Sequence, residues 1–229
     1  MKQTQLLQRV STDLEHRGYI SVPGPNPGAA SVHFKRQDEL VLLFGIEFSR
    51  LYRERFTGSF FLSKTFEWAY VVPGFPKQAY RRIGGLMNKA ERMQLLDNEF
   101  QEAGVKDAWW IGFSEASHLA FMEAHDLTIS RFLEQPKLFE LVRRCKEVDH
   151  HFDMVEQSIY LAETLKHKPA ECRNTPTTPR LGIPLEWFWG AEVVLRKCEP
   201  KLVSNKYVEL LARDAYRFQS LYSTSSIPK

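Results

Sequence analysis

The chain has 229 residues, of which 43% are hydrophobic, and its 31 Lys and Arg against 28 Asp and Glu give a formal net charge of +3. This size and composition argue against extensive disorder and favour a globular protein, and the charge is too mild for a dedicated nucleic-acid binder. The longest apolar runs are far shorter than the roughly 20 residues of a membrane span, and the first 20 residues are unlike a signal peptide. We therefore expect a cytoplasmic protein.

The first part of the chain predicts a helix followed by antiparallel strands. Apolar residues recur at helical spacing over residues 4–17, and Gly18 follows as a stop signal. A loop rich in proline and glycine covers residues 21–30. The pattern then changes to strict alternation, which is typical of half-buried antiparallel strands. The alternating segments cover residues 31–35, 39–49 and 57–72, and they carry Phe44, Phe48, Phe56, Phe60, Phe66, Trp68 and Tyr70.

Helical signals return after this block. Asn88 and Glu91 form a capping-box arrangement at the start of a helix predicted over residues 89–103. Residues 109–113 are short and aromatic, and they predict either a last strand or a hydrophobic plug. A further helix begins after Ser114 and contains His118 and His125, two turns apart, which we expect to be partly buried and hydrogen-bonded.

The last third of the chain is helical. Apolar residues from residue 138 alternate spacings of three and four, which is a heptad pattern; they are Leu138, Leu141, Cys145, Val148, Phe152, Val155, Ile159 and Ala162. This pattern predicts a long helix that packs on other helices of the chain or on a second copy in a homodimer, and two shorter helices with a break near Asp149 would also satisfy it. A proline-rich linker at residues 168–184 precedes two more helices, at 184–198 and 200–222.

These elements predict the α+β class. We expect an N-terminal antiparallel sheet with flanking helices over residues 1–135, and a helical half over residues 136–229 that packs on it to form one compact unit. Cys145, Cys172 and Cys198 are odd in number and far apart, which suits a reducing compartment better than a disulfide framework.

Catalytic and metal-binding patterns are weak. Glu47 and Glu67 lie in predicted strands, but neither has the lysine two residues on that a metal-dependent nuclease would place there. Glu147, His150 and His151 combine imidazole and carboxylate on one helix, which is the chemistry of a divalent metal site. Two consecutive histidines point about 100° apart on a helix, so the alternative is a solvated polar flank. We predict no catalytic residue and no cofactor.

A basic segment with aromatic residues is the strongest surface feature. It comprises Arg50, Tyr52, Arg53, Arg55 and Lys64. Arginine for phosphates and aromatic rings for bases is a nucleic-acid pattern. However, Glu54 and the low net charge weaken the field, and arginine with tyrosine is also what protein interfaces use as anchors. We therefore interpret this segment as an interface candidate.

The order of several short motifs resembles an uncharacterised bacterial family of unknown function over residues 4–135. The motifs are Gly18-Tyr19, His33-Phe34-Lys35-Arg36, Phe48-Ser49-Arg50, Phe56-Thr57, Arg82-Ile83-Gly84 and Asp107-Ala108-Trp109-Trp110. The predicted helix at residues 89–103 and the helical half after Pro136 depart from a minimal member of that family. The resemblance implies a bacterial, cytosolic α+β domain and assigns no catalytic residue.

The absence of an assembled active-site motif, together with aromatic surfaces and the heptad pattern, favours a non-catalytic bacterial protein-interaction protein. Its concrete form is an immunity protein that blocks a toxin, or an accessory subunit of a defence or conflict system. The alternatives are a metal-dependent nuclease or hydrolase and a nucleic-acid-binding protein that uses the basic segment. We expect another protein as partner, with nucleic acid less favoured and no membrane association.

Overall fold

The computed structural model describes residues 1–24, 26, 28–52, 54–66, 75–96, 109–166 and 182–223. The chain forms two compact units, which are described separately below. The first unit comprises Met1–Lys64 and Trp68–Cys145, and the second comprises Thr65–Glu67 and Lys146–Lys229. The predicted α+β class is confirmed, because the N-terminal part holds an antiparallel sheet and the C-terminal half is mostly helical.

The first unit is built on a six-stranded antiparallel sheet with the order β1-β2-β3-β4-β5, in which β6 also pairs with β4. The strands are β1 (Ile20–Ser21), β2 (Ser31–Gln37), β3 (Leu40–Phe48), β4 (Arg55–Ser63), β5 (Tyr80–Arg82) and β6 (Trp110–Ile111). The register places Phe44 opposite both His33 and Phe60. Aromatic residues that alternate in the sequence therefore share one face, because successive side chains of a strand point to opposite faces.

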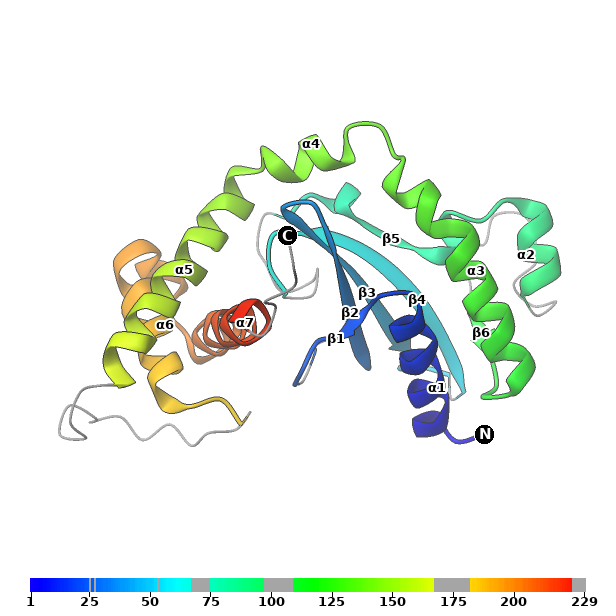
Figure 1. The fold of residues 1–229 in the computed structure, drawn as a ribbon, viewed down its shortest axis with the longest axis horizontal. Helices are drawn as coiled ribbons and strands as arrows, with labels where there is room; N and C mark the ends of the chain where they lie inside the picture. Colours follow the sequence, from blue (N-terminus) through cyan, green and yellow to red (C-terminus); the bar gives the residue numbers. More distant parts are fainter. Residues whose placement is uncertain are drawn as a thin grey trace. The chain divides into compact units, whose positions relative to one another are not determined.

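Two helices cover that aromatic face, α1 (Gln3–His16) and α3 (Glu115–Leu133) (Figure 1). The rings of Phe44 and Phe121 lie 6.0 Å apart between the sheet and α3, and both side chains are fully buried. Gly18 has φ +80°, the left-handed conformation that glycine adopts without a Cβ penalty, and it follows α1 as predicted. The unit also contains α2 (Lys89–Leu95), α4 (Leu138–Arg143) and the short 3₁₀ turns η1 (Lys77–Ala79) and η2 (Ile83–Gly85).

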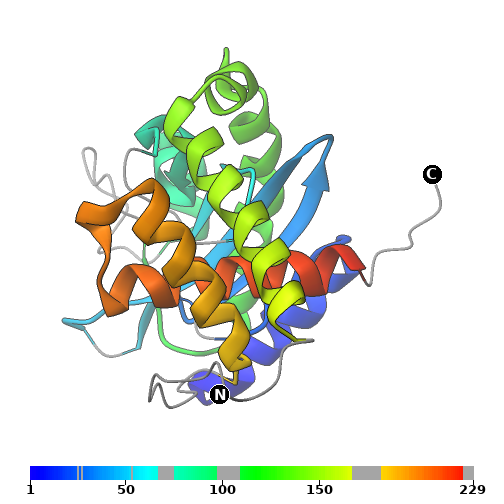
Figure 2. The same cartoon turned by 90° about the vertical axis from the view of Figure 1, so that its left-hand side faces the viewer.

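The second unit is made of α5 (Lys146–Lys166), α6 (Leu185–Cys198) and α7 (Asn205–Ser223), with a 3₁₀ turn, η5 (Pro200–Leu202), before α7. Figure 2 shows α5 and α6 side by side, with α7 crossing them. The heptad residues Val148, Val155 and Ala162 are buried, and α5 packs on both other helices. These three heptad residues are thus covered within this chain, whereas Leu141 of α4 is 37% exposed, and pairing with a second copy stays a prediction.

Several predicted boundaries differ from the structure. The heptad segment is two helices, but the break lies at Arg144–Cys145 and not near Asp149, because the helical hydrogen bonding of α4 ends at Arg144. Pro200 opens the 3₁₀ turn and the last helix begins only at Asn205. The capping box at Asn88 is present, and α2 is described to Leu95. The end of that predicted helix, the strand predicted beyond residue 66, and most of the linker at 168–184 lie outside the described residues.

Candidate functional site

The turn between β3 and β4, together with the first residue of β4, is called the β3–β4 tip below; its described residues are 49–52, 54 and 55. Its backbone is held by local hydrogen bonds. The Ser49 hydroxyl accepts from the amides of Leu51 and Tyr52 at 3.3 and 3.0 Å, and the Ser49 amide donates to the Arg55 carbonyl at 2.9 Å. A side chain that satisfies backbone amides in this way is a common means of fixing a tight turn.

The tip exposes apolar and cationic side chains together. Leu51 is 86% exposed and Tyr52 is 55% exposed, and Arg50 is also exposed. The Arg55 guanidinium lies 4.1 Å from the centre of the Tyr52 ring, a cation–π contact that orders both side chains. At the base of the tip, the Gly112 amide donates to the Glu54 carbonyl at 2.7 Å. The tip therefore presents a large apolar group on a constrained backbone.

The structure brings together only part of the predicted basic segment. Arg50, Tyr52 and Arg55 lie in the tip, and Arg53 falls outside the described residues. Lys64 follows the last residue of β4, whereas Arg55 is the first. Nine strand residues at about 3.3 Å each span roughly 30 Å, so Lys64 lies at the other end of the sheet, where its Nζ donates to the Arg143 carbonyl at 3.4 Å.

The two histidines among the metal candidates on α5 have separate partners. His150 Nε2 lies 3.0 Å from Glu199 Oε1, and His151 Nε2 lies 2.9 Å from Asp214 Oδ2. Glu147 is exposed near the start of the helix. The interpretation of a solvated flank is wrong for His151, which is only 7% exposed and pairs with the fully buried Asp214 of α7. Among the described residues no group of three metal-ligating side chains converges.

Glu47, the strand carboxylate of the nuclease alternative, is buried and forms an ion pair with Arg82. Its carboxylate accepts hydrogen bonds from the Ser59 hydroxyl at 2.8 Å, the Tyr80 hydroxyl at 2.9 Å and the Arg82 guanidinium at 3.1 Å. A carboxylate paired in this way is satisfied, as a buried charge must be. Glu67, the second carboxylate of that alternative, lies outside the described residues. The Glu47 cluster therefore fits a structural role in the sheet.

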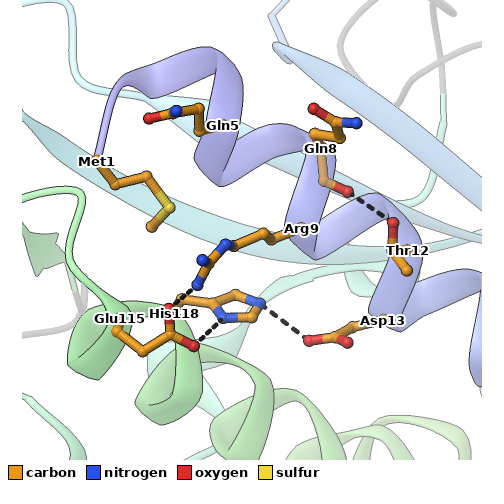
Figure 3. A pocket seen from close by; sticks show the side chains of 8 residues that line it. All are labelled: Met1, Gln5, Gln8, Arg9, Thr12, Asp13, Glu115 and His118. Atoms are coloured by element: carbon orange, nitrogen blue, oxygen red, sulfur yellow. Dashed lines mark hydrogen bonds and ion pairs between the residues drawn. The ribbon is translucent and has the colours of Figure 1, made fainter.

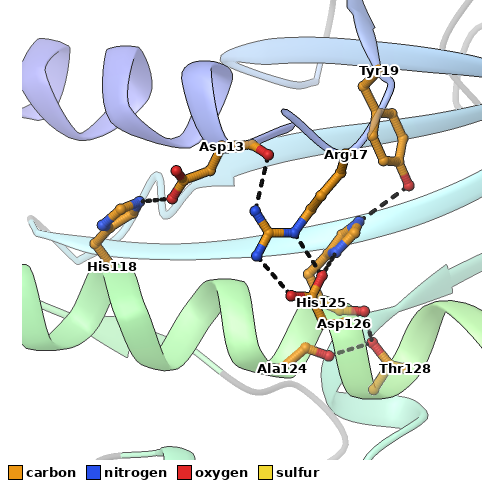
Figure 4. A network of polar contacts seen from close by, with 8 residues as sticks. All are labelled: Asp13, Arg17, Tyr19, His118, Ala124, His125, Asp126 and Thr128. Carbon is orange, nitrogen blue, oxygen red and sulfur yellow. Dashed lines mark hydrogen bonds and ion pairs between the residues drawn. The ribbon is translucent and has the colours of Figure 1, made fainter. Parts of the chain in front are cut away.

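A polar network joins the end of α1 to α3 (Figure 4). Arg17 donates from Nε and Nη2 to the two oxygens of Asp126 at 2.7 and 2.6 Å. His125 lies between Asp126, 2.8 Å from its Nδ1, and the Tyr19 hydroxyl, 3.1 Å from its Nε2. The expectation that His125 is buried and hydrogen-bonded is confirmed. Arg17, Tyr19, His125 and Asp126 each have a hydrogen-bond partner, so these four side chains hold the helix end in place.

Burial and hydrogen bonding together set the charge states of the network. Burial lowers the pKa of His125, and the adjacent Asp126 only partly offsets that effect. Burial alone would raise the pKa of Asp126, but hydrogen bonds from His125 and Arg17 outweigh it and hold this pKa well below its usual range. Burial raises the pKa of Tyr19 far above its ordinary value. A neutral imidazole therefore sits beside a charged Arg17–Asp126 pair.

A pocket of about 820 Å³ opens between α1 and α3 (Figure 3). It is lined by Met1, Gln5, Gln8, Arg9, Thr12, Asp13, Glu115 and His118. Within each helix these polar residues stand three or four positions apart, on one face. The sequence analysis missed the pocket because the two helices are about a hundred residues apart, and only the tertiary fold brings them together.

The sequence matches no protein-family model, no curated protein and no solved structure. The resemblance over residues 4–135 thus rests on its short motifs alone. Within the described ranges, no helix combines the length and apolar character that crossing a membrane requires.

Proposed function

We propose that this chain is a non-catalytic bacterial protein-interaction protein and that the β3–β4 tip is its contact with a partner protein. An immunity protein that blocks a toxin, or an accessory subunit of a defence system, is the concrete form of the proposal. The observation that carries it is the 86% exposure of Leu51 on a turn whose backbone is fixed by hydrogen bonds.

The energetic argument rests on preorganisation. Complete burial of a leucine side chain is worth about 1.5–3 kcal/mol, and tyrosine and arginine are enriched among the residues that dominate binding energy. The turn is already ordered by Ser49, and Tyr52 is already stacked on Arg55. The tip therefore loses little conformational freedom when it binds. The loss of such freedom is what usually reduces the affinity of an exposed loop.

The charge of the tip defines the partner surface. Arg50 and Arg55 flank the apolar residues, and Glu54 is the acidic residue of the tip. The matching surface is an apolar pocket for Leu51 with an acidic rim, since opposite charges at the rim steer association and set specificity. A nucleic-acid role has less support, because Lys64 lies at the far end of β4 and cannot extend the cationic surface of the tip.

Photo-crosslinking in the bacterial host tests this proposal. A photoreactive residue in place of Leu51 should capture one discrete protein. The same residue in place of Tyr160, which is 72% exposed on α5, serves as the control and should not capture it. The captured protein, once purified, should bind Leu51→Ala at least roughly 10-fold more weakly than the unaltered chain, since about 1.4 kcal/mol corresponds to tenfold in Kd.

Three outcomes would contradict the proposal. The first is the absence of a position-dependent crosslink, and the second is equal affinity of the unaltered chain and Leu51→Ala for the captured protein. The third is capture of nucleic acid, with an affinity that falls steeply with salt as phosphate contacts release counterions.

A further inference from the structure

Glu54 of the β3–β4 tip has a backbone conformation that suits glycine better than glutamate. Its φ is +63°, in the left-handed region, where a side chain crowds the backbone and costs free energy. The surrounding fold holds this conformation, since the Glu54 carbonyl accepts a hydrogen bond from the Gly112 amide at 2.7 Å. A glycine could keep that hydrogen bond without the crowding. The glutamate side chain therefore gives the turn no local structural advantage.

The Glu54 carboxylate is exposed and has no partner of its own. The register of the two strands places Arg50 opposite Glu54 across the turn, because the Ser49 amide donates to the Arg55 carbonyl one position further down. Facing residues of opposite charge commonly form an ion pair. Here neither Arg50 nor Glu54 is paired with any residue that the structure describes. The tip thus presents a positive and a negative charge that the chain itself does not use.

Strain alone does not indicate a contact, as two other residues show. Among the described residues Asp38 and Lys137 also have positive φ. Asp38 is of a type that tolerates the left-handed region, and its carboxylate lies 3.6 Å from Arg143. Lys137 is exposed and charged, like Glu54, but it lies away from the tip. What distinguishes Glu54 is its unpaired charge on the same constrained turn as Leu51.

We infer that Glu54 contacts a basic side chain, a lysine or an arginine, of the partner protein. This inference rests on the proposed function, because it places Glu54 in the same contact as Leu51. The partner then carries one basic group within the acidic rim that faces Arg50 and Arg55. Two opposite charges in one contact fix the orientation of the partner, since a rotated partner would bring like charges together.

The chemistry of the carboxylate limits what can face it. A carboxylate only accepts hydrogen bonds, so the facing group has to be a donor. A neutral donor would leave the charge uncompensated as the contact excludes water, which is costly. A lysine or an arginine supplies both the donor and the opposite charge, and such hydrogen bonds are the stronger kind.

Binding of the protein captured through position 51 tests the inference. Glu54→Gln removes the charge and Glu54→Gly removes the side chain, and each should weaken binding by roughly 10-fold or more, as loss of one member of an interfacial charge pair does. Glu54→Asp keeps a carboxylate on a residue type that tolerates the left-handed region. It should bind within roughly threefold of the unaltered chain, because the charge-assisted hydrogen bond is retained.

Lys137→Gly is the matched control for the glycine variant. Lys137 has the same φ of +63°, but it directly precedes α4. The Arg143 carbonyl of α4 accepts from Lys64 at the end of β4 opposite the tip. Lys137→Gly should therefore leave binding unchanged. Native-state hydrogen exchange should find both glycine variants at least as stable as the unaltered chain, since each relieves a left-handed residue.

Several results would overturn the inference. They are equal affinity of Glu54→Gln and the unaltered chain, equal losses of affinity in Glu54→Gly and Lys137→Gly, a loss in Glu54→Asp as large as in Glu54→Gln, and a loss of stability in Glu54→Gly. If Leu51→Ala weakens binding and the Glu54 variants do not, only this inference fails. If Leu51→Ala binds as tightly as the unaltered chain, the proposed function fails as well.

Discussion

Replacing Gly58 with alanine probes how tightly the sheet packs on the helices above it. Gly58 lies in β4, and a Cβ added there would be 2.6 Å from Phe44 Cζ and 2.9 Å from both Ile83 Cδ1 and Phe121 Cζ. Carbon atoms in contact normally lie about 3.5–4.0 Å apart. Two of these atoms belong to rigid rings that are fully buried, so the new methyl group can be accommodated only if packed neighbours move.

The expected cost follows from overpacking. Adding a methyl group to a close-packed core typically destabilises by about 1–3 kcal/mol. Gly85→Ala is the matched control, because a Cβ at Gly85 meets nothing within 4 Å and its φ is not in the left-handed region. Alanine at position 85 reduces the conformational entropy of the unfolded chain, so Gly85→Ala should leave the free energy of unfolding unchanged or raise it by up to about 1 kcal/mol. The two variants should therefore differ by roughly 2 kcal/mol or more in the stability of the first unit.

Native-state hydrogen exchange measures this difference where it should occur. The amides of β3 and β4 should lose about 30-fold more protection in Gly58→Ala than in Gly85→Ala, since every 1.4 kcal/mol is tenfold. A unit-resolved measurement is needed because the chain has two compact units and a single unfolding midpoint would mix them. Equal protection in the two variants would refute the packing argument and the ring positions on which it rests.

Three further predictions concern other parts of the chain. Burial lowers the pKa of His33 to about 4, so the stability that neutral His33 contributes is complete above about pH 6.5 and is lost as the pH falls from there through 4. The first unit of His33→Gln should therefore lose less stability on acidification than that of the unaltered chain, by up to roughly 3 kcal/mol at 1.36 kcal/mol per pH unit, measured by amide exchange of β2 and β3. Asn88→Ala removes the N-cap of α2 and should destabilise that helix by about 1 kcal/mol, measured by amide exchange, whereas Asn88→Asp should not. Gly190→Ala would place a Cβ 2.9 Å from the Ser158 carbonyl oxygen and 3.2 Å from the Ala162 amide nitrogen. Because these are backbone atoms and cannot rotate away, the second unit should be destabilised by about 2 kcal/mol or more. Unchanged amide protection of α5 and α6 in native-state hydrogen exchange would contradict the close approach of the two helices.

Local patterns account for what sequence analysis recovered. The alternation around Phe44 and the helical spacing before Gly18 are read from neighbouring residues, because strands and helices repeat every 2 and 3.6 residues. The capping box at Asn88 is equally local, since its two hydrogen bonds join residues three apart. The predicted burial of the two histidines on α3 is confirmed. The predicted hydrogen bonds are confirmed for His125 but not for His118, whose ring nitrogens have no hydrogen-bond partner among the described residues.

Long-range pairing decided the rest. The heptad pattern continues through the break at Arg144–Cys145, because apolar residues stay in step on both sides of it. Burial of His151 depends on Asp214, 63 residues away, and no spacing rule connects them. The sequence could have predicted that Arg55 and Lys64 lie far apart, since a nine-residue strand separates its two ends by roughly 30 Å.

The sequence by itself determined the α+β class and most elements, because these depend on periodicity and on contacts between near neighbours. It indicated Arg50, Tyr52 and Arg55 of the β3–β4 tip, whereas the exposure of Leu51 was seen only in the structure. The pocket of His118, Glu115, Arg9 and Asp13 was decided only by the tertiary structure. Its two halves come from helices about a hundred residues apart in the sequence. These polar side chains line a common pocket only because α1 and α3 pack beside each other on the sheet. Each half alone is an ordinary polar helix surface.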